Sequence, residues 1–130
     1  MSVTLSSIPS SFDEALGFLK GKDSRACGNN TTVLRVQTGI GVRYHNTIIG
    51  IFHADGTLTV STGGWHTVTT KSRINRMLYD ARWTLGSTRG QMHWTYRHGN
   101  RDSETVEFRD GDRVFLGRGK GCAIWQEYGK

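Results

Sequence analysis

The chain is poor in proline and in long apolar runs, and each shortage excludes a class of protein. Seventeen glycines against a single proline favour many tight turns, as in a strand-rich protein. No apolar run approaches the roughly 20 residues of a membrane-spanning helix. The first residues, MSVTLSSIPSSF, lack the charged and apolar regions of a signal peptide. We therefore expect a cytoplasmic protein with no membrane partner.

Cysteine is also scarce, which argues against metal and redox chemistry. Cys27 and Cys122 lie almost a chain length apart, and neither belongs to a C-x-x-C motif. Free buried thiols are the expectation. A disulfide between them would require an oxidising compartment, for which nothing else in the sequence argues.

Apolar residues make up only 35% of the chain, but four Trp, five Phe and four Tyr supply bulky core material. A folded chain is therefore expected, rather than a disordered one. At 130 residues we expect one domain, residues 1–130, which buries roughly two thirds of the surface of its unfolded chain. Residues 1–27 should form an N-terminal helix and loop, and residues 28–130 a β-rich body.

Positive charge is in excess and is unevenly distributed. The net charge is +6, and residues 71–130 carry twelve Lys or Arg against seven Asp or Glu. The first 70 residues contribute only +1, from five cations and four anions. A basic balance favours anionic partners such as nucleotides, nucleic acid or an acidic protein surface. The alternative is a charge that serves solubility alone.

The N-terminal region predicts one short helix. Ser11 and Glu14 have the spacing of a capping box, and an apolar stripe at helical spacing predicts a helix over residues 12–20 that ends at Gly21. The stripe consists of Phe12, Ala15, Leu16 and Leu19. Residues 21–30 are polar, with glycine and asparagine, and are expected to loop.

Beyond residue 30 the pattern changes to a period of two. Strands are predicted at residues 31–37, 41–44, 47–53 and 57–61, with turns at 38–39 and 54–56. Such short connections require antiparallel pairing. A short basic helix is predicted at residues 72–79, with Thr69 or Thr70 as its cap. It should turn Ile74, Met77 and Leu78 inward.

Alternation then resumes around residues 83–85, 92–96, 106–108, 114–116 and 123–125, separated by glycine-rich or Asp-Gly turns. The fold class predicted is α+β. It is a mainly antiparallel β-sheet made of two meanders, with an N-terminal helix and one short central helix.

Catalytic and metal motifs are missing. The five histidines include no H-x-x-x-H pair, the serines form no G-x-S-x-G motif, and Asp110 and Asp112 have the spacing of a turn. We expect structural or surface roles for the histidines. The sequence predicts no enzyme, no catalytic residue, no metal and no cofactor.

Cations near glycines and at a helix start indicate anion binding. Residues 117–121 combine three glycines with Arg118 and Lys120, a composition that suits an oxyanion, although a solvated turn is the alternative. Lys71, Arg73 and Arg76 lie on the central helix. Cations in the first turns of a helix oppose its dipole, so a ligand explains them better than stability does.

Aromatic and amide groups favour a ligand that carries a base. Trp65 follows two glycines and could stack on a base. Trp94 and Tyr96 alternate with cations, although core packing is the alternative for both. His45 and Asn46 could read a base edge or a ribose, or form an Asx turn. Arg43 is predicted to meet phosphate, and Asn75 to donate directional hydrogen bonds.

Several runs together resemble a family of proteins. They are GNNT at residues 28–31, VRYHNT at 42–47, DGT at 55–57, and GGWHTVTTKSRIN at 63–75. These runs are similar to those of a widespread family of small tailed-bacteriophage proteins, over about residues 28–78. A later Phe-x-Asp-Gly turn at residues 108–111 also matches the family pattern. The resemblance implies a phage product that acts in the cytoplasm of an infected bacterium. It implies no reaction.

Small accessory phage proteins often counter host defences, and a basic, glycine-rich, aromatic surface suits capture of a nucleotide. The leading hypothesis is an accessory protein that sequesters a nucleotide-derived immune signal without turning it over. A nucleic-acid binder, or an inhibitor of a host nuclease or CRISPR effector, is the alternative. A minor virion or scaffold component is the second alternative. Self-association through the N-terminal helix would supply pockets between subunits.

Overall fold

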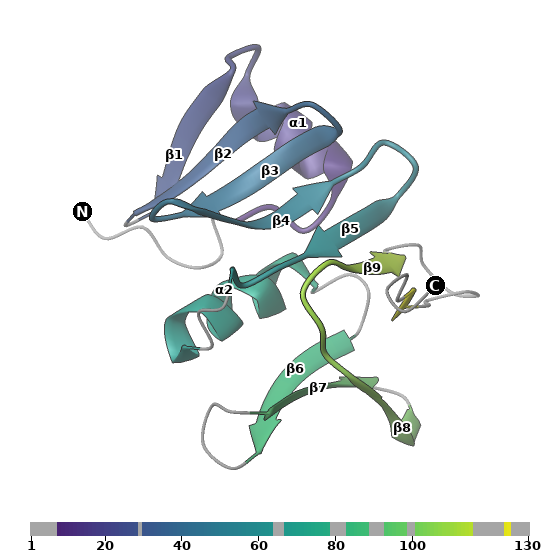
Figure 1. Ribbon diagram of the computed structural model, residues 1–130. Helices are drawn as coiled ribbons and strands as arrows, with labels where there is room; N and C mark the ends of the chain where they lie inside the picture. The colour runs from purple at the N-terminus through teal and green to yellow at the C-terminus, as the bar shows by residue number, and fades with distance from the viewer. Residues whose placement is uncertain are drawn as a thin grey trace.

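In the described residues the chain forms a seven-stranded and a three-stranded antiparallel sheet with two helices, which confirms the α+β prediction (Figure 1). The computed structural model describes residues 8–28, 30–63, 67–78, 83–88, 93–98, 101–115 and 124–125. The larger sheet has the order β1-β2-β3-β4-β5-β9-β10, and the smaller one the order β6-β7-β8.

Helix α1 (Phe12–Leu19) forms where its capping box predicts. The Ser11 hydroxyl accepts a hydrogen bond from the Glu14 N–H at 3.1 Å. The Glu14 carboxylate reaches back to the Ser10 N–H at 3.2 Å. The helix ends at Lys20, in the left-handed conformation, followed by Gly21 at φ 82°. Ala15 and Leu19 are buried against the chain's own sheet, so only part of the apolar stripe is left exposed.

Strand β1 (Ser24–Gly28) overturns the prediction that residues 21–30 form a loop. It pairs with β2 (Thr31–Val36), and Ser24 faces Leu34. The segment is polar and lacks clean alternation. Its strand conformation depends on pairing with β2, the next strand along the chain, and its own residues do not signal that pairing.

Strands β2 to β5 form the predicted first meander. Strand β3 (Gly39–Tyr44) pairs with β2, β4 (Thr47–Phe52) with β3, and β5 (Thr57–Val60) with β4. The predicted 54–56 turn is confirmed, because Gly56 takes φ 92°. The Asp55 carboxylate accepts hydrogen bonds from the Thr57 N–H at 3.0 Å and from its hydroxyl at 2.6 Å.

Helix α2 (Val68–Met77) begins four residues earlier than predicted. Its cap is Thr67, whose hydroxyl accepts from the Thr70 N–H at 3.2 Å, so neither Thr69 nor Thr70 is the cap. A run of threonines offers several possible caps, and β-branched residues weaken the helical pattern of the first turn. Ile74, Met77 and Leu78 are buried, as predicted.

The second half of the chain divides between the two sheets. Strands β6 (Trp83–Thr88), β7 (His93–His98) and β8 (Arg101–Glu107) form the small sheet. Strand β9 (Asp112–Phe115) leaves this meander and pairs with β5, and β10 (Ile124–Trp125) pairs with β9. The prediction of two separate meanders is therefore wrong for β9 and β10.

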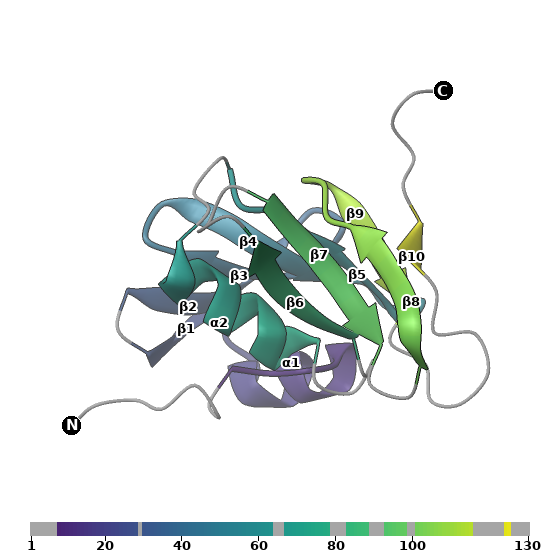
Figure 2. The same cartoon turned by 90° about the horizontal axis from the view of Figure 1, so that it is seen from below.

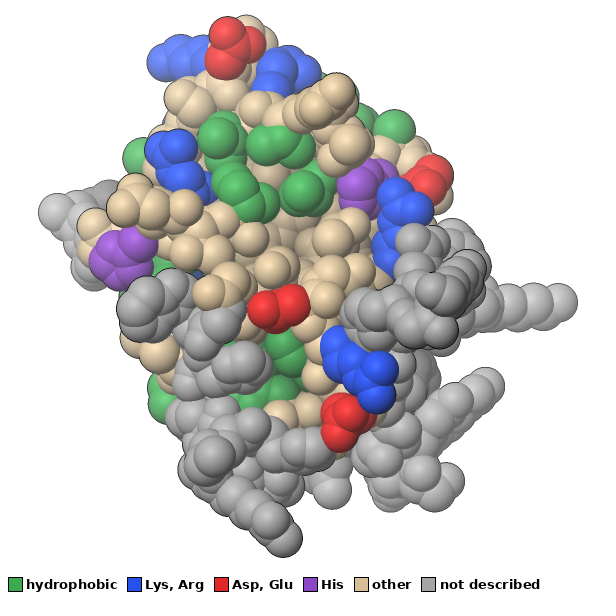
Figure 3. Space-filling view, in the orientation of Figure 1, with side chains coloured by type: hydrophobic (Ala, Val, Ile, Leu, Met, Phe, Trp, Pro, Cys, Tyr) green, Lys and Arg blue, Asp and Glu red, His purple; other side chains and the backbone are tan. Residues whose placement is uncertain are grey.

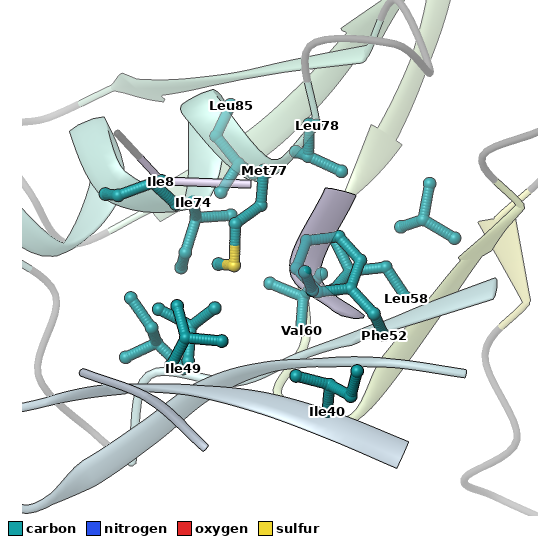
Figure 4. Close-up of a cluster of buried hydrophobic side chains, with 14 of the residues drawn as sticks. Ile8, Ile40, Ile49, Phe52, Leu58, Val60, Ile74, Met77, Leu78 and Leu85 are labelled. Atoms are coloured by element: carbon teal, nitrogen blue, oxygen red, sulfur yellow. The ribbon is translucent and has the colours of Figure 1, made fainter. Parts of the chain in front are cut away.

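One hydrophobic cluster, from Ile8 to Val114, joins both sheets and both helices. Figure 4 shows Ile74, Met77, Leu78 and Leu85, from α2 and the residues after it, facing side chains of the large sheet. Trp94 and Tyr96 are buried beside Phe108, with ring centroids 5.3 and 5.7 Å from its ring, so the core alternative holds for both. Seen from below, α2 and the small sheet lie in front of the large sheet (Figure 2).

Candidate ligand-binding cavity

The tip of the β3–β4 hairpin and the first turn of α2 enclose a cavity of about 480 Å³. Five threonines dominate its wall, and we call it the threonine cavity. The described residues that line it include no Asp, Glu, Lys or Arg. They are Tyr44, His45, Asn46, Thr47, Ile49, Thr62, Thr67, Thr69 and Thr70.

The first turn of α2 contributes Thr67, Thr69 and Thr70 to this wall and has unused backbone donors. Thr67 satisfies the Thr70 N–H, and the Lys71 N–H bonds to the Thr67 carbonyl. Within the described residues, the N–H groups of Val68 and Thr69 have no hydrogen-bond acceptor. The first turn contains no acidic residue. A helix start of this kind attracts anions through its N–H groups and its dipole.

Hydroxyl groups form a connected network on the same wall. The Tyr44 hydroxyl donates to Thr69 Oγ1 at 3.1 Å, and Thr67 Oγ1 lies 3.2 Å from Thr69 Oγ1 and 3.0 Å from Thr70 Oγ1. Thr62 is held by Asp110, whose Oδ1 accepts from the Thr62 N–H and hydroxyl at 2.9 Å each. These bonds fix the polar atoms of the wall before any ligand arrives.

The hairpin tip supplies the other wall through His45 and Asn46. His45 takes φ 56°, a left-handed conformation that favours glycine, and its ring lies 4.3 Å from the Tyr44 ring. Both side chains are exposed, and neither makes a hydrogen bond within the described residues. Positive φ is uncommon outside glycine, but Lys20 adopts it too as the cap of α1, so it is the unbonded His45 and Asn46 side chains that mark this tip as a candidate contact.

Arg73 lies behind this wall rather than in it. Its guanidinium stacks on the Tyr44 ring at 4.1 Å, Nε donates to Thr31 Oγ1 at 3.0 Å, and a terminal nitrogen donates to the Thr69 carbonyl at 3.1 Å. The charge therefore positions Tyr44 and Thr69 and adds a positive potential beneath the cavity.

Other predicted site residues lie elsewhere. Asn75 holds β6: its amide donates to the Leu85 carbonyl at 3.1 Å and accepts from the Leu85 N–H at 2.6 Å. Lys71 and Arg76 are half-buried on α2 and do not line the cavity. Arg43 precedes Tyr44 on β3, so its side chain points to the opposite face of the sheet.

Three predicted site residues, Trp65, Arg118 and Lys120, lie outside the described residues. Sequence reasoning missed Tyr44 and the threonines as wall residues. The signal is the threonine-rich run around residue 67, which the sequence alone presents as a source of helix caps.

The described side chains offer little for catalysis. Cys27 is buried, and burial raises the pKa of its thiol to about 11, against a smaller lowering by Arg73. His53 is fixed between the Thr38 carbonyl at 3.0 Å and Thr59 Oγ1 at 2.7 Å. Over the described ranges, no cluster of three His, Cys, Asp or Glu side chains could hold a metal ion. Neither described helix is long and apolar enough to cross a membrane.

Comparison with known proteins gives a family. The model of the Kyanoviridae Gp96 protein family matches residues 12–115, which is most of the chain and includes both helices and every wall of the threonine cavity. No curated protein and no solved structure matches the chain. The resemblance to a family of small tailed-phage proteins is confirmed. The chain belongs to the Kyanoviridae Gp96 family of phage proteins.

Proposed function

We propose that this phage protein binds a small phosphate-bearing ligand in the threonine cavity without turning it over. One observation carries the proposal: the first turn of α2, which leaves the Thr69 N–H without an acceptor among the described residues, contributes three threonines to a wall whose described lining contains no carboxylate. An anion placed there would gain hydroxyl and backbone hydrogen bonds, and the described residues that line the cavity include no carboxylate, since Asp110 lies behind Thr62.

Size and shape favour a nucleotide over inorganic phosphate. A cavity of about 480 Å³ falls within the roughly 300–1,000 Å³ that is usual for small-molecule sites. With the phosphate at Thr69, a base would lie against Tyr44 and His45, and the Asn46 amide could read its edge or the ribose. Aromatic contact with a base contributes roughly 1–3 kcal/mol, which inorganic phosphate cannot gain.

Binding without turnover suits sequestration. The described cavity wall holds no nucleophile that lies beside a base. In a phage protein, capture of a nucleotide-derived immune signal would counter host antiviral defence, and this is the biological role we propose. Trp65, two residues from Thr67 along the chain, is the proposed additional base platform, and Arg118 and Lys120 stay predicted contacts to the phosphate.

Calorimetric titration with a ligand panel tests the proposal. The panel comprises inorganic phosphate, mononucleotides, cyclic mononucleotides and cyclic dinucleotides. We expect one nucleotide class to bind at one site per chain, and phosphate to bind far more weakly. Thr69→Val should weaken that binding roughly tenfold, the effect of one lost hydrogen bond to a charged group. The matched control is Val68→Thr, which changes an exposed side chain outside the wall. Absence of binding to every nucleotide would refute the proposal.

A second measurement identifies the natural ligand. Protein purified from infected cells is denatured, and the released material is analysed by mass spectrometry. A released nucleotide supports sequestration, whereas released nucleic acid favours the alternative of a nucleic-acid binder. The salt dependence of the affinity distinguishes a nucleotide binder from a nucleic-acid binder. Affinity that depends on many backbone phosphates falls steeply with salt, whereas affinity for a small ligand changes little. Recovery of the protein in purified particles, with no ligand, would favour a virion component.

A further inference from the structure

The face of the large sheet that is turned away from the helices carries an unusual row of side chains. Val33, Val42 and Val60 point into the core, so their neighbours along each strand point outward. The pairing of the strands places the outward residues in one area. They include Thr32, Leu34 and Val36 of β2, Arg43 of β3, Ile48 and Ile51 of β4, Thr59 of β5 and Arg113 of β9. We call this area the outer face.

Four aliphatic side chains occupy the middle of the outer face. Leu34, Val36, Ile48 and Ile51 are half-buried, yet they are not among the residues that pack against the core. Strand β4 reads TIIGIF, with aliphatic residues toward both faces. Such a strand is typical of a sheet covered on both sides, whereas an antiparallel sheet with one solvated face alternates with polar residues.

Cations lie on the same face beside the aliphatic area. Within the described residues Arg43 makes no hydrogen bond or ion pair, and Arg113 Nε is buried without a hydrogen bond. Asp55 lies near Arg113, but its carboxylate is already bonded to Thr57. Figure 3 shows hydrophobic side chains gathered over β2, β3 and β4, with Lys or Arg side chains on both sides.

We propose that the outer face docks an acidic partner protein, one that presents an apolar stripe flanked by carboxylates. Contiguous apolar area on a protein surface marks an interaction site, and flanking arginines are typical of protein interfaces. A second copy of the chain would bring arginines against arginines in an isologous contact, which is unfavourable. Nucleic acid would place phosphates and bases on an aliphatic centre that offers them no hydrogen bond. The outer face lies across the sheet from the threonine cavity, so this interaction is independent of the ligand.

Photo-crosslinking of the full chain tests the proposal. A photoreactive amino acid replaces Ile48 in one variant and, as a control, Leu16, which is 41% exposed on α1 on the other side of the sheet. Both variants are produced in cells infected with the phage that encodes the chain. We expect the position-48 variant alone to cross-link to a protein with an acidic surface. A cross-link to a second copy, a cross-link to nucleic acid, or no excess over position 16 would overturn the proposal.

The captured protein is then purified and its affinity measured, because capture alone does not establish the interface. Arg43→Glu should weaken binding at least about tenfold, and so should raising salt from about 0.1 to 0.5 M. Lys20→Glu, an equal charge change on α1, should alter affinity less than about twofold. If Arg43→Glu binds like the wild type while circular dichroism shows it folded, the outer face is not the docking surface.

Discussion

The two turns that flank strand β4 reverse the chain in different ways. After β4, Gly56 takes φ 92° and the Asp55 carboxylate is bonded to the Thr57 N–H and hydroxyl. Before β4, His45 takes φ 56°, although a side chain is disfavoured there. The His45 and Asn46 side chains make no hydrogen bond within the described residues and line the threonine cavity.

The difference separates a turn that is stabilised by its own side chain from one whose side chains the proposed ligand would contact. In the 54–56 turn the Asp55 carboxylate bonds to the turn itself, and the residue at positive φ is glycine. In the 45–46 turn a less favourable residue holds that position, and polar groups remain available to a ligand. Residues that break a local rule without local compensation are expected at functional sites.

The largest effect is expected where β4, the strand between the two turns, packs on α2. Met77 is fully buried, and its sulfur lies only 2.6 Å from the position that a Cβ on Gly50 would take. Met77→Ala should lower the free energy of unfolding by about 3 kcal/mol through the cavity that it leaves. Urea unfolding measures this. Val68→Ala, at an exposed position of the same helix, should change it by less than about 0.5 kcal/mol.

The next largest effect is expected from a substitution in the 54–56 turn, which should change stability but not ligand affinity. Gly56→Ala should lower the free energy of unfolding by about 1–2 kcal/mol, because Ala at φ 92° is strained although no atom crowds the position. Nucleotide affinity should stay unchanged, since Gly56 does not line the cavity. A loss of affinity in a folded Gly56→Ala protein would break the division between the two turns.

His45→Gly should have the opposite pattern. Relief of the left-handed strain gains about 1–2 kcal/mol, and the greater entropy of the unfolded glycine chain costs about 0.5–1 kcal/mol. The variant should thus be slightly more stable, by roughly 0.5 kcal/mol, and should bind nucleotide about tenfold more weakly than the wild type. Thermal unfolding and calorimetry on one preparation give both values. Lower stability with unchanged affinity would make His45 an ordinary turn residue.

Local chemistry explains which parts of the fold could be predicted. The Ser11 capping box and the turn at Gly56 depend on residues adjacent in sequence, and both form as expected. Strand β1 was missed because it exists through its pairing with β2, and β9 was misplaced because it pairs with β5 across an intervening sheet. Pairing leaves a weak signal in one strand alone, whether the partner is adjacent in the chain, as for β1, or distant, as for β9.

The candidate site shows the same division between residues whose position local sequence predicts and residues whose position depends on tertiary contacts. His45 and Asn46 are polar at a predicted turn, and they lie on the cavity. Strand alternation predicts that Arg43 lies on the outer face, because it neighbours Tyr44. The stacking of Arg73 on Tyr44 could not be predicted from the sequence, because it requires α2 to lie beside β3.

The smallest effect concerns pH and also separates the turns. Hydrogen bonds from the Thr57 hydroxyl, and then from its N–H, lower the pKa of Asp55. The ionised carboxylate is therefore favoured by folding, so its contribution is complete above the pKa of the unfolded chain and is lost as pH falls through the lower folded value. Asp55→Asn should destabilise the protein more at pH 6 than at pH 3. Asn46→Ala, an uncharged change in the other turn, should show no such pH dependence. If the loss of stability relative to the wild type changed with pH equally for both variants, Asp55 would stabilise its turn by packing rather than by charge.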